Sequence, residues 1–148
     1  MTQNEYNAKM AEVRKWPEWL LWAVTLWAEA RGESLVGKLA VAYVIKSRHE
    51  SKQLWDDILA PKQFSCWNYY PKKQTTDPNF EKMLKLDIYH DAAFQQCIQI
   101  VFQVMLSWAS NPFKGADHYH TVNINPSWAK SMKVVGKEGN HIFLSSVA

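Results

Sequence analysis

The sequence predicts an α+β fold that is mostly helical, with a small antiparallel β-sheet in the C-terminal third. Two observations predict it. As far as about residue 107, apolar side chains recur at the spacing of helix faces. After Asn111-Pro112, short β-leaning segments alternate with Asn, Pro and Gly. The chain has 148 residues, so we expect one domain, 1–148, in which residues 1–15 extend a core of residues 16–148.

The N-terminal part predicts a peripheral helix followed by a buried one. Residues 1–15 are polar enough for an amphipathic helix. Trp16-Pro17-Glu18 is typical of a helix start, because proline fits the first helical position and an acidic residue favours the first turn. In residues 18–30 the apolar side chains occur almost all round, so we expect a buried helix. Gly32 is a typical helix stop.

A second core helix is predicted for residues 35–48, with Ser34 as its N-cap. A short helix is predicted from Leu54 to Leu59, before Pro61. One face of the second helix is expected to pack on the core through Val36, Leu39, Ala40, Tyr43 and Val44.

The rest of the chain predicts a loop, a long helix and three strands. Residues 61–80 contain three prolines and many polar residues, so we predict a loop, unusually rich in aromatics. Residues 87–107 carry apolar side chains at helical spacing and predict a long helix. The segments 116–122, 132–137 and 141–146 predict the strands of the sheet.

The composition excludes several classes of protein. Hydrophobic residues make up 47% of the chain and charged residues 21%, which is typical of a globular protein. The net charge is +3 and the lysines are scattered, which argues against a nucleic-acid binder. The apolar run from Trp19 to Ala28 is too short for a bilayer span of about 20 residues, so we expect no stable membrane insertion. Eight tryptophans and six tyrosines exceed the needs of the core, and some are expected to bind flat, amphipathic partners such as sugars.

Cysteine usage and the N-terminus bear on where the protein works. Cys66 and Cys97 form neither a CxxC motif nor zinc-type spacing, so we expect two free, partly buried thiols in a protein made in a cytoplasm. The polar N-terminus carries no signal peptide, so work outside a cytoplasm would require release by another route.

Glu29 stands out as a carboxyl group at the end of a predicted buried helix. The partial negative charge of the helix C-terminus disfavours a second negative charge there, and apolar neighbours such as Trp27 disfavour it further. A carboxyl that keeps its proton can act as a general acid, as in glycoside cleavage. The alternative is an ordinary helix-end residue that is solvated or bonded to Arg31. Arg31 is also close to Glu33, which by itself suits a capping role for the next helix.

The histidines support a rival interpretation. His118 and His120 alternate on a predicted strand and share one face, with Asp117 nearby and His141 on another strand. Histidines grouped in this way can hold zinc, but zinc hydrolases usually carry a helix motif such as HExxH, which this sequence lacks. In the simpler interpretation, His120 hydrogen-bonds within a groove and His141 packs beside Phe143. We therefore expect no metal and no other cofactor.

Four motifs in a fixed order carry a resemblance to a known family. They are EARGE at 29–33 followed by Gly37 and AVAYVIKSR at 40–48, QFSCW at 63–67, GADHYH at 115–120 followed by PSWA at 126–129, and VVGKEGNHIF at 134–143. In these motifs the chain resembles the SleB-like cell-wall hydrolases, which include spore-cortex-lytic enzymes and phage endolysins. The resemblance covers about residues 17–144.

The resemblance implies a lysozyme-like domain that cleaves peptidoglycan glycan strands between N-acetylmuramic acid and N-acetylglucosamine, with Glu29 as the catalytic residue. Such enzymes are usually lytic transglycosylases, whose reaction needs one carboxyl group. A hydrolytic muramidase would need a second carboxylate as a partner for Glu29. Glu33 and Asp117 are the candidates for that partner, and the case for each is weaker than the case for Glu29. Substrate-binding residues are expected to form groove walls around Glu29, namely Glu33, Phe64, Ser65, Trp67, Tyr69, Tyr70, Tyr119, His120 and Trp128.

Three hypotheses follow. The first is a lytic transglycosylase, the second a zinc-dependent amidase or peptidase that would be sensitive to EDTA, and the third a non-catalytic glycan-binding module, against which the embedded Glu29 argues. We expect a monomer that binds peptidoglycan strands. The small size fits a phage lysis enzyme that is made in the host cytoplasm and reaches the bacterial cell wall after release through a holin.

Overall fold

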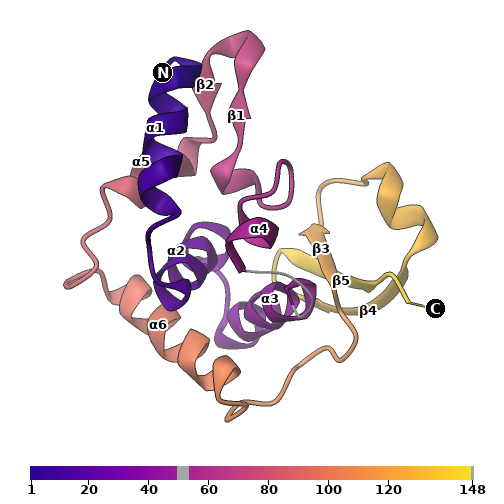
Figure 1. The fold of residues 1–148 in the computed structure, drawn as a ribbon. Helices are drawn as coiled ribbons and strands as arrows, with labels where there is room; N and C mark the ends of the chain where they lie inside the picture. The colour runs from indigo at the N-terminus through magenta and orange to yellow at the C-terminus, as the bar shows by residue number, and fades with distance from the viewer. Residues whose placement is uncertain (50–53, 148) are drawn as a thin grey trace.

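The computed structural model describes residues 1–49 and 54–147. Figure 1 shows a body of helices with the C-terminal sheet beside it. This arrangement confirms the predicted α+β class, with a mostly helical chain and a small antiparallel sheet in its C-terminal third. The helices are α1 (Gln3–Val13), α2 (Glu18–Ala30), α3 (Leu35–Arg48), α4 (Leu54–Ile58), α5 (Pro78–Leu84) and α6 (Ala92–Met105).

Helix α2 lies at the centre of the helical body. It packs against α3, α4, α5 and α6. Every residue from Leu21 to Ala28 is buried, as the all-round apolar pattern predicts. The one polar side chain in this run, Thr25, is satisfied, because its hydroxyl donates to the Leu21 carbonyl at 2.7 Å and accepts from the Trp67 indole at 2.9 Å. The core is therefore built around the helix that carries Glu29.

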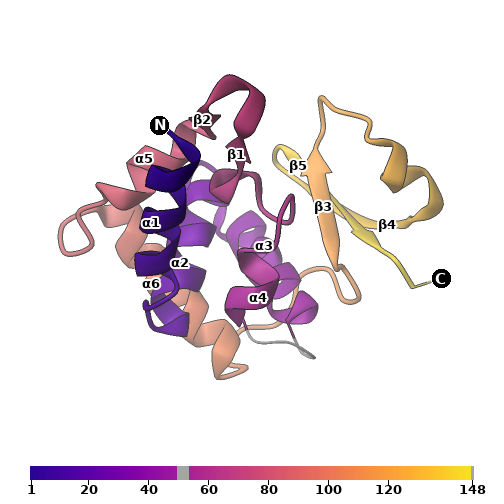
Figure 2. The same ribbon diagram turned by 45° about the horizontal axis from the view of Figure 1, so that its top comes forward.

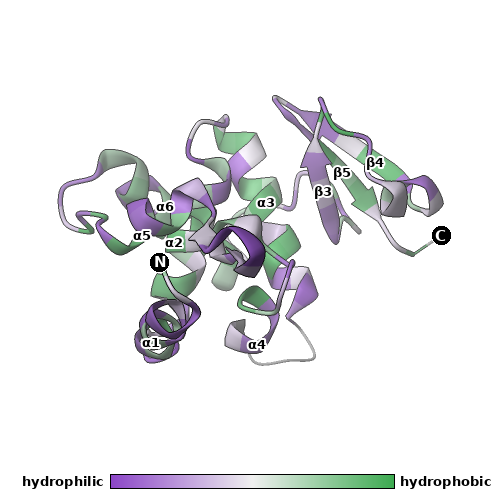
Figure 3. Cartoon of the chain, turned by 90° about the horizontal axis from the view of Figure 1, so that it is seen from above, coloured by the Kyte–Doolittle hydropathy of each residue, from purple (hydrophilic) through white to green (hydrophobic). Residues whose placement is uncertain are grey.

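Helix α1 is the predicted N-terminal helix, and it begins at a capping box formed by Thr2 and Glu5. It is coloured largely hydrophilic in Figure 3. Its Met10 and Val13 are nevertheless buried in the same hydrophobic cluster as α2. Helix α1 therefore packs on the core through these two residues.

The C-terminal sheet is antiparallel in the order β3-β5-β4. Tyr119 pairs with Phe143 across β3 and β5, and both Phe143 and Leu144 of the central strand are buried. Figure 2 shows the sheet standing beside the helical body, and β3 contacts α3. The strands are β3 (His118–Thr121), β4 (Lys133–Glu138) and β5 (His141–Ser145).

The segment between α4 and α6 holds more regular structure than the predicted loop. Helix α5 was missed, although its start signal is present: Asp77 accepts the Asn79 amide at 2.8 Å and Pro78 stands in the first turn. A second, two-stranded sheet precedes it. The other elements here are the 3₁₀ turns η1 (Ser65–Trp67) and η2 (Pro71–Lys73), and strands β1 (Tyr69–Tyr70) and β2 (Thr75–Thr76).

Several predicted boundaries and faces are corrected. Helix α6 begins at Ala92 instead of residue 87, because the Asp91 side chain caps it. Pro17 is the N-cap of α2 and not its first helical residue. The buried face of α3 is rotated from the predicted one. Val36, which was expected to pack on the core, is 42% exposed, whereas Val41, which lies outside the predicted face, is fully buried. The rotation arises because α3 packs against α2, α6 and β3 together.

Gly32 does not act as the left-handed helix stop that the sequence suggested. Arg31 is the C-cap of α2, and the glycines with positive φ in the described residues are Gly115 and Gly139. Within the same residues, no helix is both long enough and apolar enough to cross a bilayer.

Gly136 provides a test of how the sheet packs. It lies at a register shift in β4, and a Cβ there would overlap the ring of Phe113, which packs on Phe143 with centroids 5.0 Å apart. We predict that Gly136→Ala lowers the free energy of unfolding by about 1–3 kcal/mol, the usual cost of overpacking. Denaturant titration followed by circular dichroism measures it. Gly32→Ala is the matched control, since its Cβ would meet no atom within 4 Å, and equal midpoints for the two variants would contradict the prediction.

Candidate active site

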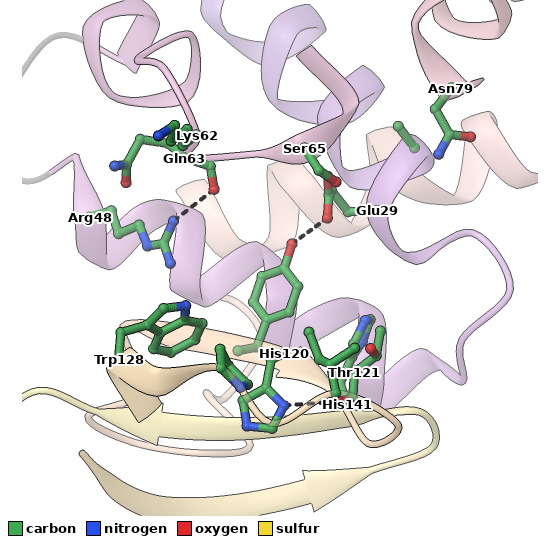
Figure 4. Close-up of a pocket in the computed structure, with 14 residues that line it drawn as sticks. Glu29, Arg48, Lys62, Gln63, Ser65, Asn79, His120, Thr121, Trp128 and His141 are labelled. Carbon is green, nitrogen blue, oxygen red and sulfur yellow. Dashed lines mark hydrogen bonds between the residues drawn. The ribbon is translucent and has the colours of Figure 1, made fainter. Parts of the chain in front are cut away.

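Glu29 lies in the last turn of α2, where the helix reaches a cleft between the helical body and the sheet (Figure 4). The hollow has a volume of about 390 Å³. Among the described residues that line it, Glu29 is the only carboxylate. The lining consists of Ala28, Glu29, Arg48, Lys62, Gln63, Ser65, Asn79, Tyr119, His120, Thr121, Ile124, Pro126, Trp128 and His141.

Two uncharged donors hold the Glu29 carboxylate. The Tyr119 hydroxyl donates to Oε2 at 2.8 Å, a bond drawn in Figure 4. The Cys66 amide donates to Oε1 at 3.4 Å, and the Cys66 thiol also hydrogen-bonds the carboxylate. Because one donor comes from β3 and the other from η1, the carboxyl group is oriented from both sides of the cleft.

Both donors keep their protons. Burial raises the pKa of Tyr119 well above its ordinary value, and the negative charge of Glu29 raises it further. Burial also raises the pKa of the Cys66 thiol, with the same contribution from Glu29. Cys66 and Cys97 are both free and buried, so the predicted free thiols are confirmed. Neither donor to Glu29 therefore adds a charge of its own to the site.

Arg31, the partner that the sequence suggested for Glu29 or Glu33, turns away from both. Its guanidinium donates to the Trp27 carbonyl at 3.3 Å and to the Asn79 side chain at 2.9 Å, and it lies 4.3 Å from the Trp27 ring centre. A cation at this position complements the negative end of α2. Arg31 therefore caps the helix and leaves the Glu29 carboxylate to Tyr119 and Cys66.

Glu33 faces a neighbouring hollow that shares Glu29 and His141 with the first. Its Oε1 accepts the Asn140 amide at 3.3 Å and lies 3.3 Å from His141 Nδ1, a contact without the geometry of a hydrogen bond. Burial lowers the pKa of His141, although the carboxylates of Glu33 and Glu29 oppose the shift. Glu33 thus ties the α2–α3 turn to the β4–β5 turn, with its side chain only 10% exposed.

Two cations border the cleft. Arg48 donates from Nε to the Asp117 carbonyl at 2.7 Å and from Nη1 to the Gln63 carbonyl at 3.3 Å, and it lies 5.1 Å from the Phe64 ring centre. It therefore connects the helical side of the cleft to the sheet. Lys62 stands nearby on the loop before η1 (Figure 4). This rim gives the cleft a positive potential that suits an anionic polymer.

Two histidines of β3 pack against Trp128, which lies in the 3₁₀ turn η3 (Ser127–Ser131). His118 and His120 share one face of the strand, as predicted, because both rings contact Trp128 with centroids 5.4 and 5.8 Å away. His120 Nδ1 lies 2.8 Å from the Thr121 carbonyl. Trp128 is 41% exposed and lines the cleft, so it presents an open aromatic surface close to Glu29.

A zinc site would need at least three His, Cys, Asp or Glu side chains close together. The described part of the chain contains no such group. His141 instead packs beside Phe143 with centroids 6.1 Å apart, and His120 lines the cleft, as the simpler interpretation predicted. Asp117 accepts the Ser146 amide at 2.9 Å and hydrogen-bonds His118 at 2.8 Å. Burial raises the pKa of Asp117, but these hydrogen bonds outweigh it and the net pKa is lowered.

The loop aromatics lie in places that differ from those predicted. Phe64 and Trp67 are each 2% exposed and belong to the core, so they do not form walls around Glu29. Tyr69 lines a separate hollow next to α1. Of the predicted substrate-binding residues, the cleft gathers Ser65, Tyr119, His120 and Trp128, while Glu33 lines the adjoining hollow.

Sequence reasoning missed several residues of the cleft. Arg48 and Gln63 stand within motifs that had been recognised, so a signal for them was present. Lys62 and Asn79 lie in the predicted loop of residues 61–80 and outside the family motifs, so no sequence feature indicated that they line the cleft. The role of Cys66 beside Glu29 depends on the packing of η1 against α2 and could not be seen in the sequence.

Solved structures share this fold. The catalytic domain of the SleB protein of Bacillus cereus aligns with a TM-score of 0.62 and 22% identity, over 86% of this chain and 89% of that one. The catalytic domain of the germination-specific lytic transglycosylase SleB of Bacillus anthracis aligns with a TM-score of 0.64 and 20% identity, over 86% and 93%. These likenesses confirm the lysozyme-like fold that the motifs implied.

No curated protein matches the chain. The sequence profile of the cell wall hydrolase family matches residues 32–144, which include α3, η1 and all of the C-terminal sheet except the last residue of β5. The match begins directly after the turn that carries Glu29. It covers most of the chain, and the protein belongs to the cell wall hydrolase family.

Proposed function

We propose that the protein is a peptidoglycan lytic transglycosylase that uses Glu29 as its only catalytic acid and base. The observation that carries this proposal is the single carboxylate in the cleft, held by two uncharged donors. The family supports peptidoglycan as the polymer, and one of the structural neighbours is itself described as a lytic transglycosylase. The bond cleaved would join N-acetylmuramic acid to N-acetylglucosamine.

In the first step, protonated Glu29 donates its proton to the glycosidic oxygen. The bond from that oxygen to C1 of the muramic sugar breaks, and N-acetylglucosamine leaves with a new hydroxyl group. Positive charge develops at C1 of the muramic sugar, close to the carboxylate that Glu29 has become. Such a transition state is stabilised electrostatically in a cleft that excludes water.

In the second step, the Glu29 carboxylate removes the proton from the C6 hydroxyl of the same muramic sugar. The C6 oxygen bonds to C1, and the product is a 1,6-anhydro ring. Glu29 regains its proton, so the cycle consumes no water. Tyr119 and Cys66 would hold the carboxylate in position between the two steps.

A hydrolytic muramidase is the alternative, and it would require a second carboxylate at a defined distance across the cleft. Both earlier candidates are otherwise engaged. Glu33 bonds the β4–β5 turn, and Asp117 bonds Ser146 and His118. This engagement favours the reaction that needs one carboxyl group.

We further propose that the enzyme is a phage endolysin that acts at the bacterial cell wall. In this role it would accumulate in the host cytoplasm and reach the wall after release through a holin. The family membership supports the polymer on which it would act.

Glu29→Gln is predicted to lower the rate of cell-wall lysis by about a hundredfold or more, because an amide cannot serve as acid or base. The measurement is the fall in turbidity of purified sacculi, with circular dichroism to show that the variant is folded. Glu18→Gln, at the opposite end of α2, is the matched control and is expected to lyse normally. A folded Glu29→Gln variant with near wild-type activity would end the proposal.

Tyr119→Phe is predicted to lower kcat by about tenfold with little effect on KM, because it removes a hydrogen bond to the reacting carboxylate. Steady-state rates over a range of substrate concentrations measure kcat and KM separately. Tyr43→Phe is the control, since its hydroxyl donates to the remote Ala109 carbonyl. An unchanged kcat for Tyr119→Phe would show that the hydroxyl has no part in the reaction.

The products distinguish the two mechanisms. A C6 hydroxyl held at C1 competes well with water, since positioned groups reach effective molarities of roughly 10⁵ M or more. We predict muropeptides that end in 1,6-anhydro-muramic acid, lighter than hydrolytic products by one water and resistant to borohydride. Mass spectrometry of digested sacculi, with and without borohydride, measures this. Reducible muramic ends as the main product would establish the muramidase instead.

A further inference from the structure

A second hollow, separate from the Glu29 cleft, lies between α1 and the β1–β2 hairpin. Its volume is about 380 Å³, and most of its lining is apolar. Gln3 and Tyr6 contribute from α1, Trp67 from η1, and Tyr69 and Tyr70 from β1. The family match begins at residue 32, so the wall formed by α1 lies outside the part of the chain that defines the family.

The aromatic side chains of this hollow are fixed in place. Tyr6 and Tyr69 are stacked, with ring centroids 5.0 Å apart and planes 24° from parallel. The Trp67 ring below them is 2% exposed and is fixed by its bond to Thr25. Tyr70 is 40% exposed and leaves an open aromatic surface. Rigid aromatic surfaces of this kind bind the apolar faces of sugar rings with little loss of conformational entropy.

Hydrogen bonds attach α1 to the other side of the hollow. The Tyr6 hydroxyl donates to the Trp67 carbonyl at 2.7 Å, and the Tyr69 hydroxyl donates to the Met1 carbonyl at 3.0 Å. The N-terminal ammonium group donates to the Gln74 carbonyl at 3.2 Å. Figure 1 shows α1 running alongside the hairpin as a result. These hydrogen bonds therefore fix the two walls of the hollow relative to each other.

The hollow adjoins the cleft at Lys62, which lines both. On the far side of Glu29, the cleft shares Thr121 and His141 with the hollow of Glu33. The cleft thus adjoins one hollow at Lys62 and another at Thr121 and His141, and Glu29 lines both the cleft and the hollow of Glu33. A polymer cleaved at Glu29 has to extend in both directions, and the aromatic hollow is next to the cleft on the side of Lys62.

We propose that the hollow formed by Gln3, Tyr6, Trp67, Tyr69 and Tyr70 is a distal subsite that binds a sugar of the glycan strand remote from the cleaved bond. The inference rests on the proposed function and adds the position at which the strand is held. Its charge suits peptidoglycan, whose peptide stems carry carboxylates: Lys62 stands at the junction with the cleft, and Lys72 and Lys73 follow Tyr70 on η2. The subsite would therefore increase kcat/KM on long glycan strands only.

Tyr70→Ala tests the subsite, because it removes the most exposed ring and keeps the half-buried Tyr6–Tyr69 stack. The matched control is Tyr89→Ala, which removes a ring that is 79% exposed and outside the lining of the three hollows. Each variant is assayed on long glycan strands and on a soluble fragment of two disaccharide units. Tyr70→Ala is expected to lower the ratio of kcat/KM on long strands to that on the fragment by roughly three- to tenfold, the effect of losing one aromatic contact. Tyr89→Ala should leave the ratio unchanged.

Binding provides a second measurement that does not depend on turnover. The Glu29→Gln protein, with and without Tyr70→Ala, is titrated calorimetrically with chitooligosaccharides of increasing length. The affinity should rise at the length that reaches the hollow, and Tyr70→Ala should remove that rise. An equal ratio for all proteins, or a rise that survives the substitution, would overturn the subsite. Failure of the transglycosylase proposal would show separately, in reducible product ends with the length dependence intact.

Discussion

The burial of α2 on nearly every side is the constraint on which the rest of the structure depends. A helix packed by α3, α4, α5 and α6 cannot rotate or slide without opening the core. Its last turn therefore emerges at one fixed place, and Glu29 is held at the cleft by the packing of residues far from it. Arg31 stabilises the same end by donating to the helix carbonyls. The packing of the hydrophobic core, rather than the contacts within the cleft, therefore holds Glu29 in position.

The width of the cleft is set by polar contacts between the helices and the sheet. Glu33 and Ser34, in the turn after α2, bond Asn140 and Glu138 at the β4–β5 turn. At the other end Arg48 bonds backbone carbonyls on both sides. The sheet has only its own small hydrophobic face to place it, so these contacts decide how close Tyr119 comes to Glu29.

The sequence predicts most of the fold and the centre of the site, for physical reasons that can be traced. Helices α2 and α3 follow from apolar spacing and from the Ser34 cap, whereas Glu29 is indicated by its place at a predicted buried helix end together with the EARGE motif. The QFSCW segment shows where this reasoning stops. Gln63 and Ser65 line the cleft, whereas Phe64, Cys66 and Trp67 are buried. Aromatic type suggested sugar binding, but the side that faces the cleft is decided by how η1 packs on α2 and α5, which no local pattern encodes.

In the proposed reaction Glu29 serves first as an acid and then as a base, so it needs neighbours that accommodate both its protonated and its ionised form. A guanidinium beside Glu29 would favour the carboxylate so strongly that proton donation would become difficult. The chain places Arg31 on Trp27 and Asn79 instead, and gives Glu29 the hydroxyl of Tyr119 and the amide and thiol of Cys66. A neutral donor can hydrogen-bond the carbonyl oxygen of the protonated acid and either oxygen of the ionised one. Because burial keeps the phenol and the thiol protonated, these contacts would persist through both steps of the proposed reaction, and the position of the acid would not depend on its charge.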